Sequence, residues 1–220
     1  MKARRPTRRP TGLLLMGVIA VIAAAAAAMV HWMGATSQPS GRAPMTAPEQ
    51  IGGKWRGRAA APVTIEVYSD FLCTHCADFA ATVEPALIAE FVDAGVARLV
   101  HRHFPVLGPG AEAAAEASEC AADQQRFWPY HDALFARARR GALRSPADLE
   151  AAARDAGLEP NAFAACRQNG GGRPRVDADR SEGQRRGVEG TPTTFIGERK
   201  IVGVQPLEVF RAAVRDARPR

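Results

Sequence analysis

Two stretches rich in β-branched and aromatic residues predict strands in the middle of the chain. The first, VTIEVYS at 63–69, has the composition of a strand that is buried on both faces, and the second is VARLVHRHF at 96–104. Segment 73–93 between them has helical composition, and we expect Pro85 to kink that helix. A strand, a helix and a strand in about forty residues indicate a βαβ unit with a parallel sheet.

A long helical pattern follows at 111–188. Ser145 has the properties of an N-cap, because Pro146 behind it suits the first position of a helix. The remaining expected features of this block are a helix restart at Pro129, a short helix at 161–168, a break at Gly170 to Gly172 and a last helix at 176–186.

The pattern changes again near the end of the chain. Segments 193–196 and 200–202 predict two short strands, which Gly197 and Glu198 join in a tight hairpin. A closing helix is expected from a buried stripe of Leu207, Phe210 and Val214. The order strand, helix, strand, helical block, strand, strand, helix predicts an α/β fold.

An apolar run at 12–33 is long enough to cross a bilayer core of about 30 Å as a helix. The basic segment 1–11 before it predicts a single-pass signal-anchor with the later residues outside the cell. A cleaved signal peptide is the alternative, and it also exports the domain. Residues 34–54 are rich in Pro, Gly, Ser and Thr and read as a flexible linker to a domain at 55–220.

The charge distribution argues against nucleic-acid binding. The net charge is +6, but five basic residues stand before the apolar run, which leaves 24 basic residues against 23 acidic ones. The exported part is therefore nearly neutral. The chain has 220 residues, of which 46% are hydrophobic, and this suits one well-buried core rather than two.

Four cysteines in an exported domain form two unlike pairs. Cys73 and Cys76 lie where the first strand gives way to a helix, and the free N–H groups there stabilise a thiolate. Cys73 is then the nucleophile, and Cys76 is the resolving thiol of a redox-active disulfide. Cys120 and Cys166 lie far apart in the helical block, where a structural disulfide is favoured over two free buried cysteines.

The residues around these cysteines resemble the DsbA-like branch of the thioredoxin superfamily, close to its membrane-tethered forms. The resemblance implies a thioredoxin fold with a helical insertion at about 108–188. Four stretches carry it: VTIEVYSDFLCTHC at 63–76, RHFPV at 102–106, ECAADQQRFWPYHDALF at 119–135 and GTPTTFIGERKIVGVQP at 190–206.

The resemblance also implies roles for single residues. Pro192 matches the cis-proline that faces the cysteine pair, and the backbone of Thr191 would pair with an extended substrate. His75 matches the histidine that stabilises the nucleophilic thiolate in oxidising members. Relatives carry a buried acid where this chain has Val67, so the neighbouring Glu66 is either a proton relay or a surface-paired charge.

The resemblance implies a monomeric enzyme without cofactor that donates disulfides to reduced exported proteins. A quinone-linked membrane reoxidase, of the DsbB or the vitamin-K-epoxide-reductase type, would regenerate it. A reductase or isomerase of the same fold is the first alternative. The second is a metal-binding module with Cys73, Cys76, His101 and His103 as ligands.

Overall fold

The computed structural model describes residues 53–143 and 145–219. The chain divides into two units, 1–44 and 45–220, and all described residues belong to the second. The expected basic segment, membrane anchor and most of the linker lie outside the described residues. Among the helices that are described, none combines the length and the apolar character that a membrane crossing requires.

A five-stranded mixed sheet forms the centre of the domain, with strand order β1-β3-β2-β4-β5. Strands β2 and β3 are parallel, as the βαβ pattern predicts, and the other neighbours are antiparallel. The hairpin at Gly197 joins β4 to β5 as expected. The strand bounds are Trp55–Gly57 for β1, Val63–Ser69 for β2, Ala97–His103 for β3, Thr193–Ile196 for β4 and Arg199–Val202 for β5.

Strand β1 was not predicted, and two residues that the sequence analysis places in the linker, Gly53 and Lys54, contact the domain. The backbone carbonyl of Lys54 accepts a hydrogen bond from the N–H of His101, and Gly53 packs so closely on Ala122 that a Cβ would lie 2.6 Å from that side chain. Both residues therefore belong to the folded domain. A three-residue edge strand has too little periodicity to be recognised from sequence.

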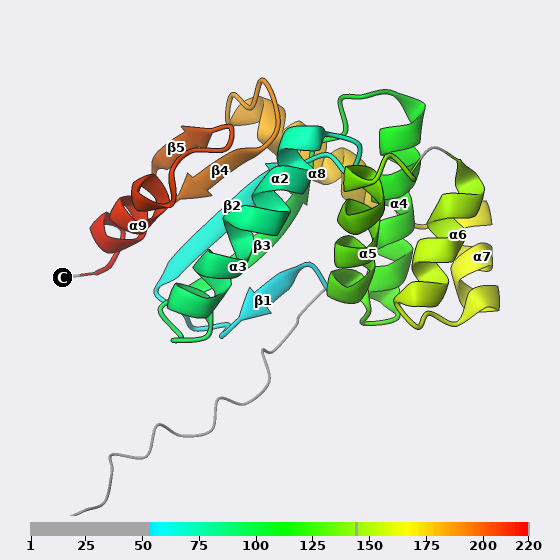
Figure 1. The fold of residues 1–220 in the computed structure, drawn as a ribbon, viewed down its shortest axis with the longest axis horizontal. Helices are drawn as coiled ribbons and strands as arrows, with labels where there is room; N and C mark the ends of the chain where they lie inside the picture. Colours follow the sequence, from blue (N-terminus) through cyan, green and yellow to red (C-terminus); the bar gives the residue numbers. More distant parts are fainter. Residues whose placement is uncertain (1–52, 144, 220) are drawn as a thin grey trace, which may run out of the picture. The chain divides into compact units, whose positions relative to one another are not determined.

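The helix after the first strand is interrupted at Val83, immediately before the segment that carries Pro85. Three pieces result: α2 (Thr74–Thr82), α3 (Glu84–Leu87) and the π-helical turn η1 (Ile88–Val92). Pro85 has no backbone N–H to donate to the preceding turn, so the helix breaks at this point instead of continuing with the expected kink. Helices α2 and α3 cover one face of the sheet, and α8 lies behind it (Figure 1).

The two faces of β2 are unequal, which corrects the prediction of a strand buried throughout on both. Val63, Ile65 and Val67 point into the main core, which also contains the closing helix α9 (Leu207–Asp216). On the other face Thr64 and Glu66 are only half-buried. A small separate cluster at the end of that face consists of Tyr68, Phe104, Val188 and Phe195.

The helical insertion occupies the expected part of the chain. Helices α4 to α7 gather beyond one end of the sheet, and α8 returns to it (Figure 1). The predicted cap at Ser145 is present as a capping box with Asp148, whereas the restart expected at Pro129 begins at Phe127. The bounds are Pro109–Asp123 for α4, Phe127–Arg139 for α5, Pro146–Asp155 for α6, Pro160–Gln168 for α7 and Arg173–Arg185 for α8.

A disulfide between Cys120 of α4 and Cys166 of α7 links two helices of the insertion. Their Cα atoms are 5.8 Å apart. The bridge that the sequence favours over two free thiols is therefore present. Cys120 is buried and Cys166 is half-buried, so the bond runs from the core of the insertion toward its surface.

Candidate active site

Cys73 is the N-cap residue of α2, directly after strand β2 and the short turn at 70–72. Its backbone is extended, with φ −76° and ψ 121°, so the chain changes from strand to helix at the sulfur-bearing residue. Cys73 is half-buried, whereas Cys76, one turn further on, is buried. The first helical N–H groups have no partner within the helix, and they surround the Cys73 sulfur with partial positive charge.

The two thiols are both free, and their pKa values move in opposite directions. The pKa of Cys73 falls to about 5, chiefly because the side chain of Cys76 hydrogen-bonds to it. Partial burial opposes this shift, while the amides of Cys76 and His75 and the side chain of Thr191 favour it. Burial raises the pKa of Cys76, and its hydrogen bond to Cys73 adds to that effect. At neutral pH the half-buried Cys73 is therefore a thiolate and the buried Cys76 a thiol.

Thr191 and Pro192 face this cysteine pair. The Thr191–Pro192 peptide bond is cis, as the resemblance implies. When protonated, the Cys73 thiol donates a hydrogen bond of 3.5 Å to the carbonyl oxygen of Thr191. The sheet brings these groups together across 118 residues of sequence, because β4 pairs directly with β2.

Asp70 fixes the geometry of the turn that precedes Cys73, and the sequence analysis missed it. Its carboxylate is 1% exposed and accepts three backbone hydrogen bonds, at 2.8 Å from Leu72, 2.8 Å from Val106 and 3.0 Å from Leu107. The side chains of Val106 and Leu107 are 48% and 53% exposed. Asp70 thus holds an exposed apolar loop beside the cysteine turn. The available signal was an acid at the end of an apolar strand.

Glu66 lies away from this chemistry. Its carboxylate binds Arg102 at 2.8 Å and Arg186 at 2.6 Å. Burial raises its pKa, but the hydrogen bonds from Arg186 and Arg102 outweigh this and leave the pKa lowered overall. These two ion pairs agree with the alternative in which Glu66 is a surface-paired charge, and neither of them involves Cys73 or Cys76. The proposed relay through Glu66 has no support among the described contacts.

His75 is exposed, and its backbone amide rather than its ring is among the groups that lower the pKa of Cys73. No hydrogen bond or ion pair of its imidazole occurs among the described residues. The influence of the His75 ring on the thiolate therefore stays a prediction.

The metal-binding alternative is not supported, because its four residues do not form one ligand group. His101 is 2% exposed and stacks on Phe71, with ring centroids 5.2 Å apart. His103 bonds through Nε2 to Glu119 at 2.9 Å. Potential ligand clusters among the described residues contain neither Cys73 nor Cys76. Both histidines are buried side chains whose rings pack against Phe71.

Known proteins resemble most of the described domain. Residues 49–216 match the thioredoxin family model. The chain is 38% identical over 164 residues to Na(+)/H(+) antiporter NhaA 1 of Salinispora arenicola, which covers 74% of this chain and 24% of that protein. It thus spans about a quarter of that relative. Disulfide bond formation protein D of Bacillus subtilis is 24% identical over 159 residues, covering 66% and 68%.

Solved structures share the architecture. Oxidised BdbD from Bacillus subtilis superposes with a TM-score of 0.69 at 21% identity, covering 78% of this chain and 96% of that one. The thiol-disulfide exchange protein alpha-DsbA2 from Wolbachia pipientis gives a TM-score of 0.65 at 20% identity, covering 74% and 86%. At these identities the likeness concerns the fold. Because the family model matches residues 49–216, which is most of the chain, the chain belongs to the thioredoxin family.

Proposed function

We propose that this chain is an extracytoplasmic thiol–disulfide oxidoreductase that donates the Cys73–Cys76 disulfide to exported proteins. One observation carries the proposal. An accessible thiolate at a helix N-terminus, with a pKa lowered to about 5, stands beside a buried thiol whose pKa is raised. A low pKa makes Cys73 a good leaving group, and a stabilised thiolate favours the reduced enzyme over its disulfide.

The exchange proceeds in two steps. A substrate thiolate attacks Sγ of Cys73, the Cys73–Cys76 bond breaks, and Cys76 leaves and takes up a proton. A second substrate thiolate then attacks the substrate sulfur of the mixed disulfide, and Cys73 leaves as a thiolate. Two electrons pass to the enzyme. Of the two substrate protons, one ends on Cys76 and the other in solvent.

The backbone near Cys73 suits an extended substrate. The carbonyl of Thr191 lies 3.5 Å from the sulfur, where it can accept a hydrogen bond from a substrate strand once the thiol proton is gone. The exposed side chains of Val106 and Leu107, held by Asp70, offer apolar contact to unfolded protein. Thr191 and this loop therefore position a substrate cysteine without specifying its neighbours.

The location and the partners rest on the sequence. The apolar run at 12–33 and its basic flank support a membrane anchor with the domain outside the cell. Reduced exported proteins are the proposed substrates. In reoxidation, the reduced enzyme passes the two electrons to a quinone through a membrane partner of the DsbB or vitamin-K-epoxide-reductase type.

The reduction potential of Cys73–Cys76 tests the direction of exchange. Equilibration of wild type with glutathione buffers should give a value nearer ~−120 mV than the ~−270 mV of thioredoxin. His75→Ala should move it toward the reducing side if the imidazole stabilises the thiolate. Cys73→Ser should abolish oxidation of a reduced, unfolded substrate. If the wild-type reduction potential is close to that of thioredoxin and His75→Ala leaves it unchanged, the protein is a reductase rather than an oxidase.

A further inference from the structure

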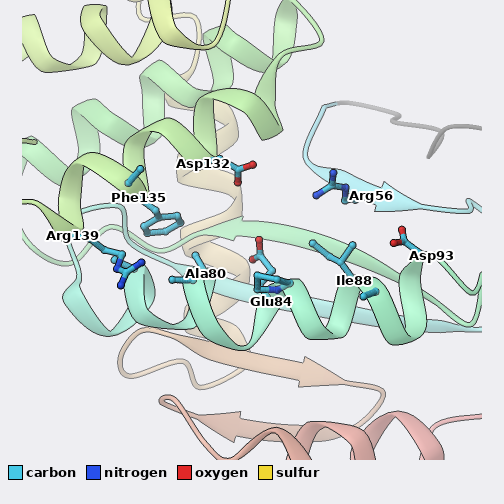
Figure 2. Close-up of a pocket in the computed structure, with 13 residues that line it drawn as sticks. Arg56, Ala80, Glu84, Ile88, Asp93, Asp132, Phe135 and Arg139 are labelled. Atoms are coloured by element: carbon cyan, nitrogen blue, oxygen red, sulfur yellow. The ribbon is translucent and has the colours of Figure 1, made fainter.

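A cavity of about 480 Å³ lies between the α2–α3 segment and α5, apart from the cysteine pair. Figure 2 shows Glu84 in it, with Asp132 on the facing helix and Arg56 from β1 nearby. Much of the lining is alanine, which leaves room beside the acidic groups. Its size falls in the range of small-ligand pockets, about 300–1,000 Å³.

Glu84 is a buried acid that no lysine or arginine among the described residues pairs with. It is 6% exposed. Within the described part of the chain, no lysine or arginine lies within ion-pair distance of its carboxyl group, although Arg56 and Arg139 also line the cavity. A buried carboxylate ordinarily requires a paired charge or a metal. Burial raises the pKa of Glu84, and within the described residues only the ring of His131 lies within ion-pair distance of its carboxyl group.

At the same place His131 has one ring nitrogen without a hydrogen-bond partner among the described residues. The residue is 1% exposed, and the nitrogen concerned is Nε2. That nitrogen is 3.9 Å from Oε2 of Glu84. On the other side of the ring, Nδ1 lies 2.9 Å from Oδ1 of Asp132. In the neutral tautomer that donates from Nδ1 to the Asp132 carboxylate, the lone pair of the ring is on Nε2, on the side of Glu84.

We propose that Glu84 and His131 bind a first-row divalent metal ion such as Zn²⁺, with water from the cavity completing the coordination. The pairing of His131 with Asp132 is the carboxylate–histidine arrangement that orients metal-bound imidazoles. Nitrogen and oxygen donors of this kind suit Zn²⁺. The site is distinct from the cysteine pair and goes beyond the proposed redox function.

The distance between the donors is close to what the ion requires. Donor atoms of a tetrahedral zinc centre lie about 3.4 Å apart. Nε2 and Oε2 at 3.9 Å thus need to approach by about half an ångström, which a small side-chain rotation provides. Arg56 opposes a cation by its charge, but its guanidinium lies over the ring of Trp128, 5.7 Å from the centroid.

A second buried acidic cluster offers an internal comparison. His103, Glu119 and Asp179 also bring their ligand atoms together. There the ammonium of Lys54 supplies the positive charge, at 2.7 Å from Glu119 and 2.5 Å from Asp179. No lysine of the described residues binds the Glu84 cluster in this way, so we propose that it takes up an ion from solution.

Titration calorimetry with ZnCl₂ on chelator-treated, tag-free, oxidised protein tests the site. With both disulfides closed, no thiolate competes for the metal. Wild type should bind one Zn²⁺ per chain, and Glu84→Gln and His131→Asn should lose this binding. Asp132→Asn should weaken it by ~10–100-fold, as loss of an outer hydrogen bond to a metal-bound histidine does. Asp93→Asn, in the same cavity but outside the cluster, is the matched control and should bind like wild type.

X-ray absorption of the zinc-loaded protein identifies the ligands independently. We expect nitrogen and oxygen neighbours at ~2.0–2.2 Å and no sulfur at ~2.3 Å. If His131→Asn does not fold, Glu84→Gln, which keeps the shape of the side chain, decides alone. Absence of zinc binding in wild type, full binding in folded Glu84→Gln, or a sulfur neighbour overturns the proposal. None of these results bears on disulfide exchange, which Cys73→Ser tests separately.

Discussion

At the residue scale, Cys73 and Cys76 differ only in their surroundings. Cys73 caps the N-terminus of α2, where free amide groups surround it, whereas Cys76 lies within the helix and is buried. Amide and thiol hydrogen bonds stabilise the charge on Cys73, and burial penalises a charge on Cys76. The environment therefore assigns attack and release to different sulfurs.

This difference predicts the titration of the reduced protein. Thiolate absorbance should appear with a midpoint near pH 5, and Cys73→Ser should remove it. Unfolding restores an ordinary cysteine pKa of about 8.5, so the unfolded chain binds more protons between these values. The free energy of unfolding of the reduced protein should thus rise as pH increases from about 5 to about 8.5, and fall as pH drops back through 5. The oxidised protein lacks this dependence, and a midpoint near 8.5 contradicts the assignment.

Asp70 is the second residue whose effect can be measured. Asp70→Ala leaves the N–H groups of Leu72, Val106 and Leu107 without their acceptor, and each such loss costs ~1–3 kcal/mol when buried. We expect urea unfolding to show a net loss of about 2–4 kcal/mol. Asp70→Asn keeps one acceptor oxygen and should cost about half as much. The exposed Asp78→Asn is the control and should match wild type, and an equally small effect of Asp70→Ala excludes the positioning role.

At the level of helices and strands, several contacts hold the helices of the insertion to one another and to the sheet. The disulfide ties α4 to α7, and the hydroxyl of Tyr130 in α5 donates to the Leu149 carbonyl of α6 at 3.2 Å. Helix α8 then lies directly on the sheet at Gly183, where a Cβ would come within 2.9 Å of Tyr68 and Phe104. The small residue permits that close contact.

The Cys120–Cys166 bond should stabilise the domain without taking part in exchange. It spans 46 residues of sequence, for which the chain-entropy model gives about 4 kcal/mol. The double variant Cys120→Ala/Cys166→Ala should therefore unfold at lower urea concentration while still oxidising a substrate. Peptide mapping during stepwise reduction should show Cys73–Cys76 opening first. The reverse order of reduction would assign the labile disulfide to the insertion instead.

At the scale of the whole molecule, ion pairs connect the beginning of the domain with the sheet and the insertion. Lys54 binds Glu119 of α4 and Asp179 of α8, and Arg102 of β3 joins Asp179 at 3.1 Å. Removing one member of a buried pair leaves an unpaired charge, which is costly. This network explains why the folded domain already includes Lys54, ahead of its first strand.

Membrane attachment is the prediction that belongs to the full chain. The protein expressed with residues 1–33 should stay in the membrane fraction after an alkaline carbonate wash, because its apolar run is long enough to span the bilayer. Deletion of 1–33 should release a folded, redox-active domain. A mature N-terminus beyond residue 33, found by N-terminal sequencing of the wild-type protein, would favour a cleaved signal peptide over the anchor.

The features that depend only on neighbouring residues could be predicted from the amino-acid sequence. Strands β2 and β3 follow from β-branched runs, the cap at Ser145 from its proline neighbour, and the Cys73–Cys76 pair from its place between strand and helix. The order of the elements then restricts the topology, because the crossover connection of a strand–helix–strand unit is almost always right-handed. These signals depend on neighbours within a few turns of the chain.

Tertiary structure decided everything that depends on distant contacts. The opposite pKa shifts of the two thiols, the placement of Thr191 beside Cys73, the three bonds of Asp70 and the ion pairs of Glu66 all require segments that only the folded sheet brings together. Burial likewise distinguishes the solvent-exposed His75 from the enclosed His131. Desolvation and hydrogen bonding are set by the surrounding atoms, and residue type alone does not specify those atoms.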